Sequence, residues 1–283
     1  MLTLITNANI YAPEALGNHC LLLGGGKILY CGADIPAVDS SLLNETIDLQ
    51  GGALIPGLID AHVHSTGGGG EGGFSTQVPS VSLSQFTLNG ITSVVGLLGA
   101  DDETRTTANL LARTRALREE GLSAWCWTGG YHLPPTTLTG SVRRDIVHID
   151  CIIGVGELAI SDHRSSQPTF DEIARVAADT HAAGMISNKA GIVHFHLGDG
   201  ERGLEMVRRL VAETELPPAM FHPTHVNRRK ALFDEACELS RQGMTIDLTA
   251  IPAEHDDEWS AEDAWELFRE RGCPAENITV SSD

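Results

Sequence analysis

The chain has 283 residues, 42% of them hydrophobic, which is enough for a sizeable core in one large barrel or in two ordinary domains. Acidic residues outnumber basic residues 38 to 19, and the formal net charge of -19 repels nucleic acid phosphates and anionic membrane surfaces. These values argue against nucleic acid and membranes as partners. They favour chemistry on a small molecule or a peptide.

The cysteines and the N-terminus indicate the compartment. The six cysteines include no C-x-x-C pair, and several stand inside apolar runs, as reduced thiols do. The first residues lack the basic start and the long apolar centre of a secretory signal, and no window reaches the length of a membrane span. The sequence therefore predicts a cytoplasmic protein.

Two regions differ in pattern along the chain. Residues 1–52 show short strands with turns, including a hairpin at 20–31 around three glycines, and predict the N-terminal part of a small β-domain. From residue 53 onward, apolar runs of strand length alternate with helical patterns, as in repeated βα units. Strands are expected at 53–64, 91–98, 123–128, 151–160, 191–197, 219–225, 244–250 and 277–283. Helices are expected at 80–90, 103–120, 140–149, 170–184, 199–214, 228–242 and 260–271.

Eight strands with intervening helices predict an α/β fold, a (β/α)₈ TIM barrel over residues 53–283 flanked by the small β-domain. The sequence after Ser260 is typical of a capping box, and the glycine-rich run at 67–73 predicts a mobile loop after the first barrel strand. No eighth helix follows the last strand. We expect either that further chain exists or that the sequence is a fragment, and the sequence leaves both open.

Histidines and acids occur at the predicted strand ends. Side chains alternate faces along a strand, so His62 and His64 project from one side and can bind one metal ion together. Reactive groups of such barrels collect where strands end, and four further candidates stand there: Glu157, His196, His225 and Asp283. Four imidazoles and two carboxylates could coordinate one or two divalent ions such as Zn²⁺.

Several of these positions have alternatives. His194 has the same parity as His196 and could replace it or fill the barrel interior; His196 is preferred because turn residues follow it. His222 is expected to point away from His225 in a regular strand, and is therefore interpreted as structural. Asp283 could be a simple cap or turn residue, but its position at the last strand favours a ligand and general base.

Two arginines follow strands that bear candidate ligands. Arg164 and Arg228 could each bind a substrate carboxylate through two hydrogen bonds. A single loop arginine is more often a solvated ion-pair partner. The presence of two, each beside a candidate ligand, favours substrate binding.

Several stretches resemble the bacterial isoaspartyl dipeptidases of the amidohydrolase superfamily, and the resemblance covers nearly the whole chain. The most specific are GGGGEGG at 67–73, TSVVGLLG at 92–99, TGGYH at 128–132, LTGS at 138–141, AISDHRS at 159–165, PTHVNR at 223–228 and SSD at 281–283. The resemblance implies zinc ligands at His62, His64, His196, His225 and Asp283. It also implies a homo-oligomer and a further substrate contact from chain after residue 283.

The same resemblance implies substrate contacts. Glu71 matches the residue that holds the substrate α-amino group, Tyr131 the one that polarises the scissile carbonyl, and Arg164 and Arg228 those that bind substrate carboxylate. A β-aspartyl dipeptide carries one ammonium and two carboxylates, so one anionic and two cationic side chains are complementary to it.

Glu157 departs from the family, which has a carboxylated lysine that bridges two zinc ions at this position. The only lysines, Lys27, Lys189 and Lys230, are not predicted at a strand's C-terminal end, so no carbamate can form there. We hypothesise that the carboxylate of Glu157 replaces it as the bridge, with Gly156 in a β-bulge that directs Glu157 toward the metals. The alternatives are a single bound metal or reduced activity.

These residues predict metal-dependent hydrolysis of the isopeptide bond of β-aspartyl dipeptides, by a metal-activated hydroxide with Asp283 as general base and acid. One alternative is another amidohydrolase activity, on cyclic amides or N-acyl amino acids. The charges of Glu71, Arg164 and Arg228 argue against an uncharged cyclic amide. The other alternative, a non-catalytic metal-binding homologue, is disfavoured because Tyr131 and Asp283 are retained.

Overall fold

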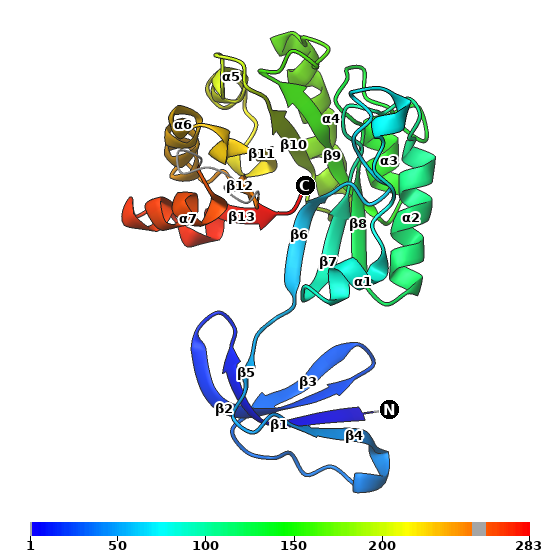
Figure 1. The fold of residues 1–283 in the computed structure, drawn as a ribbon, viewed down its shortest axis with the longest axis vertical. Coiled ribbons are helices and arrows are strands. Elements are labelled where there is room, and N and C mark those ends of the chain that lie inside the picture. Colours follow the sequence, from blue (N-terminus) through cyan, green and yellow to red (C-terminus); the bar gives the residue numbers. More distant parts are fainter. Residues whose placement is uncertain (1, 251–258) are drawn as a thin grey trace. The chain divides into compact units, whose positions relative to one another are not determined.

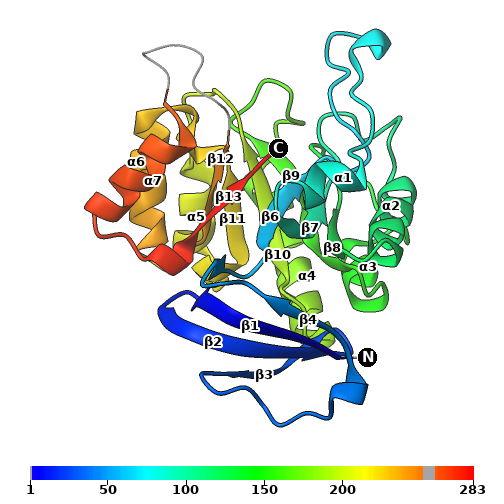
Figure 2. The same ribbon diagram turned by 60° about the horizontal axis from the view of Figure 1, so that its bottom comes forward.

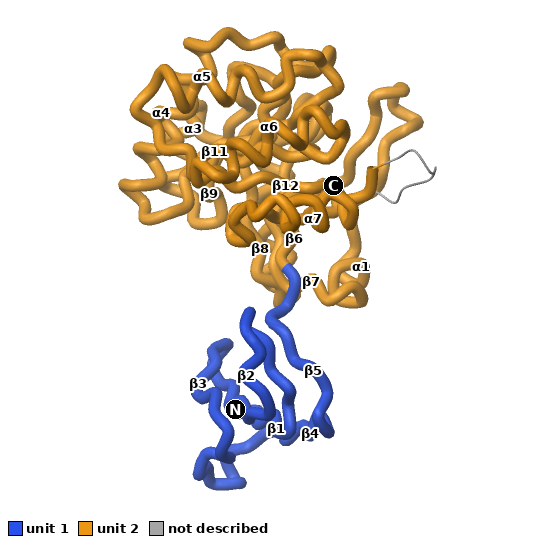
Figure 3. Tube along the Cα trace, turned by 90° about the vertical axis from the view of Figure 1, so that its left-hand side faces the viewer, with its two compact units in different colours: residues 1–58 blue, residues 59–283 orange. Residues whose placement is uncertain are grey.

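The computed structural model describes residues 2–250 and 259–283. The chain forms two compact units, residues 1–58 and 59–283 (Figure 3). The first unit extends past the predicted boundary at residue 52, because the strand β5 (Ala53–Leu54) pairs with β1 (Leu2–Tyr11). The predicted first barrel strand at 53–64 is thereby divided into β5 and β6 (Leu58–Val63).

The first unit is a five-stranded sheet. Its other strands are β2 (Ala15–Gly24), β3 (Lys27–Gly32) and β4 (Leu43–Asp48), in the order β3-β2-β1-β4 with β5 also paired to β1. The predicted hairpin between β2 and β3 is confirmed. Gly25 and Gly26 form its turn at φ values of 59° and 72°, a region that glycine adopts without steric cost. Ala8, Ile10 and Leu21 form the small buried core of the first unit.

The second unit carries the eight predicted barrel strands. After β6 these are β7 (Ile91–Gly96), β8 (Ser123–Thr128), β9 (Ile152–Ile160), β10 (Ile192–Leu197), β11 (Phe221–Thr224), β12 (Ile246–Thr249) and β13 (Ile278–Ser281). The helices between them are α1 (Leu83–Thr87), α2 (Thr107–Glu119), α3 (Val142–His148), α4 (Phe170–Ser187), α5 (Glu205–Glu213), α6 (Lys230–Ser240) and α7 (Ala261–Glu270). Figures 1 and 2 show these helices outside a curled set of strands.

The sequence signals for helix starts are confirmed. Ser260 and Asp263 form the predicted capping box of α7, in which the side chain of each residue accepts a hydrogen bond from the backbone N–H of the other. Thr169 and Glu172 form a second capping box at the start of α4. Both boxes satisfy backbone N–H groups that a helix start leaves without intrahelical partners.

The predicted (β/α)₈ architecture is present as a curled part of a barrel, and the ring of strands is not closed in the part of the chain that the structure describes. The strands form a six-stranded sheet, β11-β10-β9-β8-β7-β6, and a separate two-stranded sheet, β12-β13. The strands β11, β12 and β13 each have four residues, which leaves few backbone groups for a ladder across the gaps. Thr224 Oγ1 instead donates to Asp247 Oδ2 at 2.6 Å, and the Ser282 N–H donates to the Asp60 carboxylate at 3.3 Å.

The main core of the second unit lies among its strands and helices. Phe195, Phe221, Phe233 and Phe268 are fully buried there, and each contributes about 2–3 kcal/mol by leaving water. No helix among residues 2–250 and 259–283 has the length and apolar composition needed to cross a membrane. The packed strands provide a rigid base for the polar side chains at their ends.

Candidate metal centre and active site

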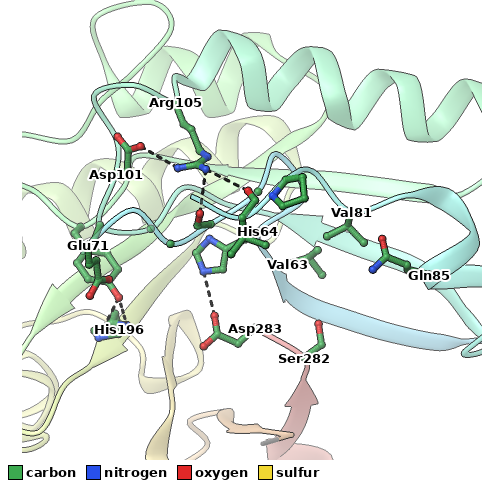
Figure 4. A pocket seen from close by; sticks show the side chains of 18 of the residues that line it. Val63, His64, Glu71, Val81, Gln85, Asp101, Arg105, His196, Ser282 and Asp283 are labelled. Carbon is green, nitrogen blue, oxygen red and sulfur yellow. Dashed lines mark hydrogen bonds and ion pairs between the residues drawn. The ribbon is translucent and has the colours of Figure 1, made fainter. Parts of the chain in front are cut away.

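The two histidines of β6 lie beside the last residue of the chain. Nε2 of His62 and Nε2 of His64 lie 3.2 and 3.0 Å from Oδ1 of Asp283. These three residues offer ligand atoms within 4.8 Å of one another, and Figure 4 shows the contact between His64 and Asp283. The Asp283 N–H also donates to the His62 carbonyl at 3.2 Å, which links the end of β13 to β6 across the gap.

Glu157 enters the site through an irregularity in β9. The ladder between β9 and β10 shifts register at this point, so that Gly156 and Glu157 stand opposite His194 alone. This confirms the predicted β-bulge. A Cβ atom at Gly156 would lie 2.7 Å from the Cβ of His194, so the close approach requires glycine. Glu157 lies inside β9 and not at its end, because the strand continues to Ile160.

The carboxylate of Glu157 faces four imidazoles. Its Oε1 lies 3.6 Å from Nε2 of both His62 and His64, and its Oε2 lies 3.1 Å from Nδ1 of His196 and 3.7 Å from Nε2 of His225. Each oxygen therefore serves a different pair of histidines. Glu157, His62 and His225 form a second group with ligand atoms within 4.8 Å, whereas His196 touches Glu157 but belongs to neither such group.

Two buried polar atoms at the centre of this cluster lack hydrogen bonds to any described residue. They are Nε2 of His62 and Oε1 of Glu157. A buried polar atom without a partner costs about 1–3 kcal/mol, so native proteins rarely leave one unexplained. Imidazole nitrogen and carboxylate oxygen are both good ligands for Zn²⁺ and similar ions. The residues therefore fit a divalent metal.

The second ring nitrogens of two histidines are fixed by further residues. Nε2 of His196 lies 2.9 Å from Oδ2 of Asp162, and Nδ1 of His225 lies 2.6 Å from Oγ1 of Thr249. Such partners orient metal-binding imidazoles and set which nitrogen carries the proton. The sequence interpretation missed Asp162. Its position directly after β9, two residues before Arg164, was the available signal.

The prediction that His222 and His225 point in opposite directions is wrong. His225 follows β11 in the left-handed region, at φ 62°, so strand alternation no longer applies to it. Its ring lies 4.7 Å from that of His196, while Nδ1 of His222 lies 3.0 Å from Nδ1 of His194. Both rings therefore face inward. His194 and His222 are buried side by side, and neither belongs to the two groups of candidate ligands.

The charges of the cluster reinforce one another. Burial opposes ionisation of Glu157 and Asp283, but the surrounding histidines outweigh it and hold the pKa of both carboxyl groups well below the usual range. Burial also lowers the pKa of His62, but the two carboxylates offset this effect and raise it to about 9. Burial dominates for His225, whose pKa falls to about 4. The cluster thus presents two anionic carboxylates, which attract a cation.

Tyr131 lies beside the candidate ligands, after β8. Its hydroxyl is 2.7 Å from Nδ1 of His196. Burial, with the charge of Glu157, raises the pKa of this phenol far above its usual range, so it stays protonated and can donate a hydrogen bond. Asp102 fixes the residues on both sides of Tyr131: its buried carboxylate contacts Nδ1 of His132 at 2.8 Å, and its side chain fills the space where Gly130 would carry a Cβ.

The predicted substrate-binding charges pair with one another. Nη1 of Arg164 donates to both carboxylate oxygens of Glu71 at 2.8 Å, and its Nη2 donates to Asp162 at 2.6 Å. Nη1 of Arg228 lies 3.8 Å from Asp199, and its buried Nε has no hydrogen bond to the described residues. Glu71 and Arg164 therefore form one ion pair at the mouth of the site.

These side chains share one cavity of about 570 Å³. His64, Glu71, Tyr131, Arg164, His196, Arg228 and Asp283 all line it, and Figure 4 shows Glu71 and His196 at one side with Val63, Val81 and Gln85 at the other. Arg105, which the sequence interpretation also missed, donates to the Gly68 carbonyl at 3.0 Å and to Asp101 at 2.9 Å. It thereby fixes the glycine-rich loop that carries Glu71.

The chain is similar in structure to a known dipeptidase. The chain aligns over 100% of its length with 76% of a crystal structure of β-aspartyl dipeptidase from the thermophilic, keratin-degrading Fervidobacterium islandicum AW-1, at 46% identity and a TM-score of 0.93. The same enzyme in complex with a β-Asp-Leu dipeptide matches equally well, with 73% of that chain covered. L-hydantoinase from Arthrobacter aurescens shares only the fold, at 15% identity, a TM-score of 0.62, and coverage of 99% of this chain and 68% of that one.

Curated sequences give a more distant match. Imidazolonepropionase from Pseudomonas putida is 31% identical over 125 residues, which is 42% of this chain and 30% of that protein. The chain thus spans under a third of the length of the curated relatives that it matches. No protein-family model matches the sequence.

Proposed function

Because this chain belongs to the β-aspartyl dipeptidase family of the amidohydrolase superfamily, we propose that it hydrolyses the isopeptide bond of β-aspartyl dipeptides with divalent metal ions, zinc foremost. One observation carries the proposal. The carboxylate of Glu157 stands between two pairs of imidazoles, and one member of each pair, His64 and His196, lines the cavity that also contains Glu71 and Arg164. Ligands for a cation and charges for a zwitterionic substrate therefore meet in one place.

Six residues would hold the metal. We assign His62, His64 and Asp283 to one ion and His196 and His225 to a second, with Glu157 as the bridge. The division follows the contacts of the two Glu157 oxygens, each of which faces a different pair of histidines. When bound, such ions supply positive charge that polarises a carbonyl and lowers the pKa of water.

Asp283 would transfer the proton. Its carboxylate is ionised at neutral pH, since His62 and His64 hold its pKa low, and a quarter of its side chain reaches the cavity. It would accept the proton of the attacking water and return it to the departing amine. The amide C–N bond then breaks with no net change in the charge of Asp283.

The other side chains would position the substrate. The protonated hydroxyl of Tyr131 would donate to the oxygen of the scissile carbonyl, where negative charge develops. The carboxylate of Glu71 would bind the substrate ammonium, and Arg164 and Arg228 would bind its carboxylates. Without substrate, Glu71 and Arg164 form an ion pair with each other. A bound dipeptide would replace this pair with two others, one between its ammonium and Glu71 and one between its carboxylate and Arg164.

The direct experiment combines metal analysis with hydrolysis. Purified protein is loaded with zinc, its metal content is measured, and release of leucine from β-Asp-Leu is compared with hydrolysis of dihydroorotate and of an N-acetyl amino acid. We expect about two zinc ions per chain and cleavage of β-Asp-Leu alone. Hydrolysis of the cyclic or acylated substrate alone would reassign the reaction. Bound zinc without any hydrolysis would support a non-catalytic protein.

The predicted partner is a small peptide, and assembly is a separate question. The family resemblance predicts a homo-oligomer, and light scattering on the purified chain tests it directly. A single monomeric mass at micromolar concentration would contradict that prediction.

A further inference from the structure

A continuous line of hydrogen bonds lies beneath the candidate metal ligands, buried between its histidines and half-buried at Thr279. Nδ1 of His62 lies 2.8 Å from Nε2 of His194, and Nδ1 of His194 lies 3.0 Å from Nδ1 of His222. Nε2 of His222 then lies 3.0 Å from Oγ1 of Thr279, whose hydroxyl contacts Oδ1 of Asp247 at 2.5 Å. We call these five residues, from His62 to Asp247, the imidazole relay.

The members of the imidazole relay come from two different sheets. His62 is on β6, His194 on β10 and His222 on β11, whereas Thr279 and Asp247 belong to the separate sheet of β13 and β12. The relay therefore crosses the interior from one sheet to the other. The side chains of its three histidines are buried, so water does not replace the two contacts between them.

Asp247 fixes the direction of the relay. Its carboxylate accepts three hydroxyl groups: Thr279 on Oδ1, and both Thr224 and Ser281 on Oδ2 at 2.6 Å. A carboxylate only accepts hydrogen bonds, so the single hydroxyl proton of Thr279 points to Asp247. The Thr279 oxygen is then free only to accept, and the proton between Thr279 and His222 must reside on the imidazole.

The same direction continues inward through the two imidazoles. Both rings are buried, they contact each other, and neither contacts a carboxylate among the described residues, so each is neutral and carries one proton. With Nε2 of His222 protonated, its Nδ1 accepts, and the proton of this contact lies on Nδ1 of His194. Nε2 of His194 is then an acceptor, and the next proton lies on Nδ1 of His62.

We propose that Asp247, acting through Thr279, His222 and His194, directs the Nδ1 proton of His62 toward His194, so that Nε2 is the nitrogen that gives up its proton when a metal ion binds. The inference rests on the proposed function only for the identity of what Nε2 binds. That atom is one of the two buried atoms of the ligand cluster that have no hydrogen bond to the described residues. His194, His222, Thr279 and Asp247 are thus positioning residues for one ligand.

The relay makes a specific spectroscopic prediction. In ¹⁵N nuclear magnetic resonance spectra of the full chain with histidine labelled, His194 should carry its proton on Nδ1 and His222 on Nε2, two different tautomers in adjacent rings. A hydrogen bond between the Nδ1 atoms of two neutral histidines already requires one ring of each tautomer, and the relay fixes which ring has which. Finding His194 protonated on Nε2, or on both nitrogens at pH 7, would overturn the proposal, and this measurement needs no metal and no activity.

Substitutions then test the link to the metal. His194→Phe removes the acceptor of His62, and we expect zinc affinity, measured by chelator competition, to fall roughly 10- to 100-fold. His194→Gln places an amide oxygen near the same acceptor position, so it should restore most of the affinity. Trp127→Phe is the packing control, because the Trp127 ring stacks on His194 at 5.4 Å without joining the relay. An equal loss in this control, or no rescue by glutamine, would refute the relay.

A further substitution separates the two proposals. Asp247→Asn lets an amide group donate toward Thr279, so the fixed pattern of tautomers should be lost even where folding, checked by circular dichroism, is intact. If wild-type protein binds no zinc but shows the two tautomers, the proposed function fails and the relay stands. If zinc binds with full affinity to His194→Phe, the relay fails and the proposed function stands.

Discussion

The metal end and the substrate end of the cavity are built differently. The ligands at the metal end stand on or directly after strands, and His62, Glu157 and His225 are almost completely buried. Glu71 and Arg164, which are proposed to bind substrate and which we call the substrate end, stand on loops, and about half of the Glu71 side chain and a quarter of the Arg164 side chain are exposed. The substrate end adjoins the candidate ligand His196, whose Nε2 lies 3.1 Å from Nη2 of Arg164. Packing in the core therefore holds the side chains of the metal end in place, whereas the loops of the substrate end are free to move when a substrate binds.

The two ends also differ in how their charges are satisfied. At the metal end, two buried atoms have no hydrogen bond in the described structure, so the cluster is complete only with a cation. At the substrate end, Arg164 already binds Glu71 and Asp162, so it is satisfied without a ligand. Changes at the metal end should therefore affect metal binding and turnover, and changes at the substrate end should affect substrate affinity.

The largest effect is expected at Asp283. Asp283→Asn removes the proton acceptor, so kcat on β-Asp-Leu should fall on the order of 10²- to 10⁴-fold. The other ligands remain, and zinc content measured by mass spectrometry should stay close to that of the wild type. Normal turnover by this variant would remove Asp283 from the mechanism.

Glu157 tests whether its carboxylate bridges two ions. Glu157→Gln removes the charge that faces both pairs of histidines, so zinc affinity should fall by more than the roughly 10- to 100-fold typical of a supporting residue. Isothermal titration should show loss of at least one of two zinc sites. Two sites of unchanged affinity would contradict the bridging role.

Substitutions of Glu71 and Arg164 test the substrate end. Glu71→Gln should weaken binding of β-Asp-Leu about tenfold, seen as a rise in KM with zinc content unchanged, because a hydrogen-bonded charge is lost. Arg164→Lys keeps the positive charge but not the fork that contacts both Glu71 and Asp162, and it should behave similarly. A fall in zinc content in either variant would show that the two ends are not independent.

Gly156 tests the geometry that places Glu157. Gly156→Ala puts a Cβ against His194 and should destabilise the protein by about 1–3 kcal/mol in urea denaturation. Gly140→Ala is the matched control: Gly140 also has a positive φ, of 79°, but nothing lies within 4 Å of its Cβ position. Equal losses in the two variants would attribute the effect to backbone strain alone.

The smallest effect concerns pH. Burial opposes ionisation of Asp162, but hydrogen bonds from His196 and Arg164 hold its pKa in the folded protein well below the unfolded value of 3.8. Its contribution to stability is therefore present above pH 3.8 and is lost as pH falls toward the folded-state pKa. In urea titrations, Asp162→Asn should be less stable than the wild type at pH 7, and the difference should shrink below pH 3.8. A constant difference would contradict this assignment.

Local sequence pattern predicted much of the fold and of the metal end. Alternation of apolar runs located all eight strands, and the same alternation placed His62 and His64 on one face. The bulge at Gly156 was predicted as part of the hypothesis drawn from the family resemblance, in which glycine suits a β-bulge that directs Glu157 toward the metals.

The rest depends on contacts that no local pattern encodes. His62 and His194 are 132 residues apart, and their hydrogen bond exists only once β6 and β10 face the same interior. The side chain of His225 does not follow the alternation of strand faces, because its backbone is in the left-handed region. The ring of strands is interrupted on both sides of the β12-β13 sheet, whose strands are short. Across these gaps, hydrogen bonds to the side chains of Asp60 and Asp247 replace the backbone hydrogen bonds of a β-ladder.

The gap between β13 and β6 has a consequence for thermal measurements. His62 and His64 stand on one side of it and Asp283 on the other, so a shared cation would tie the two sides together and stabilise the native form by mass action. The first unit supplies none of these ligands. A fluorescent reporter in the second unit should therefore register a higher melting temperature on addition of zinc, while one in the first unit serves as an internal reference.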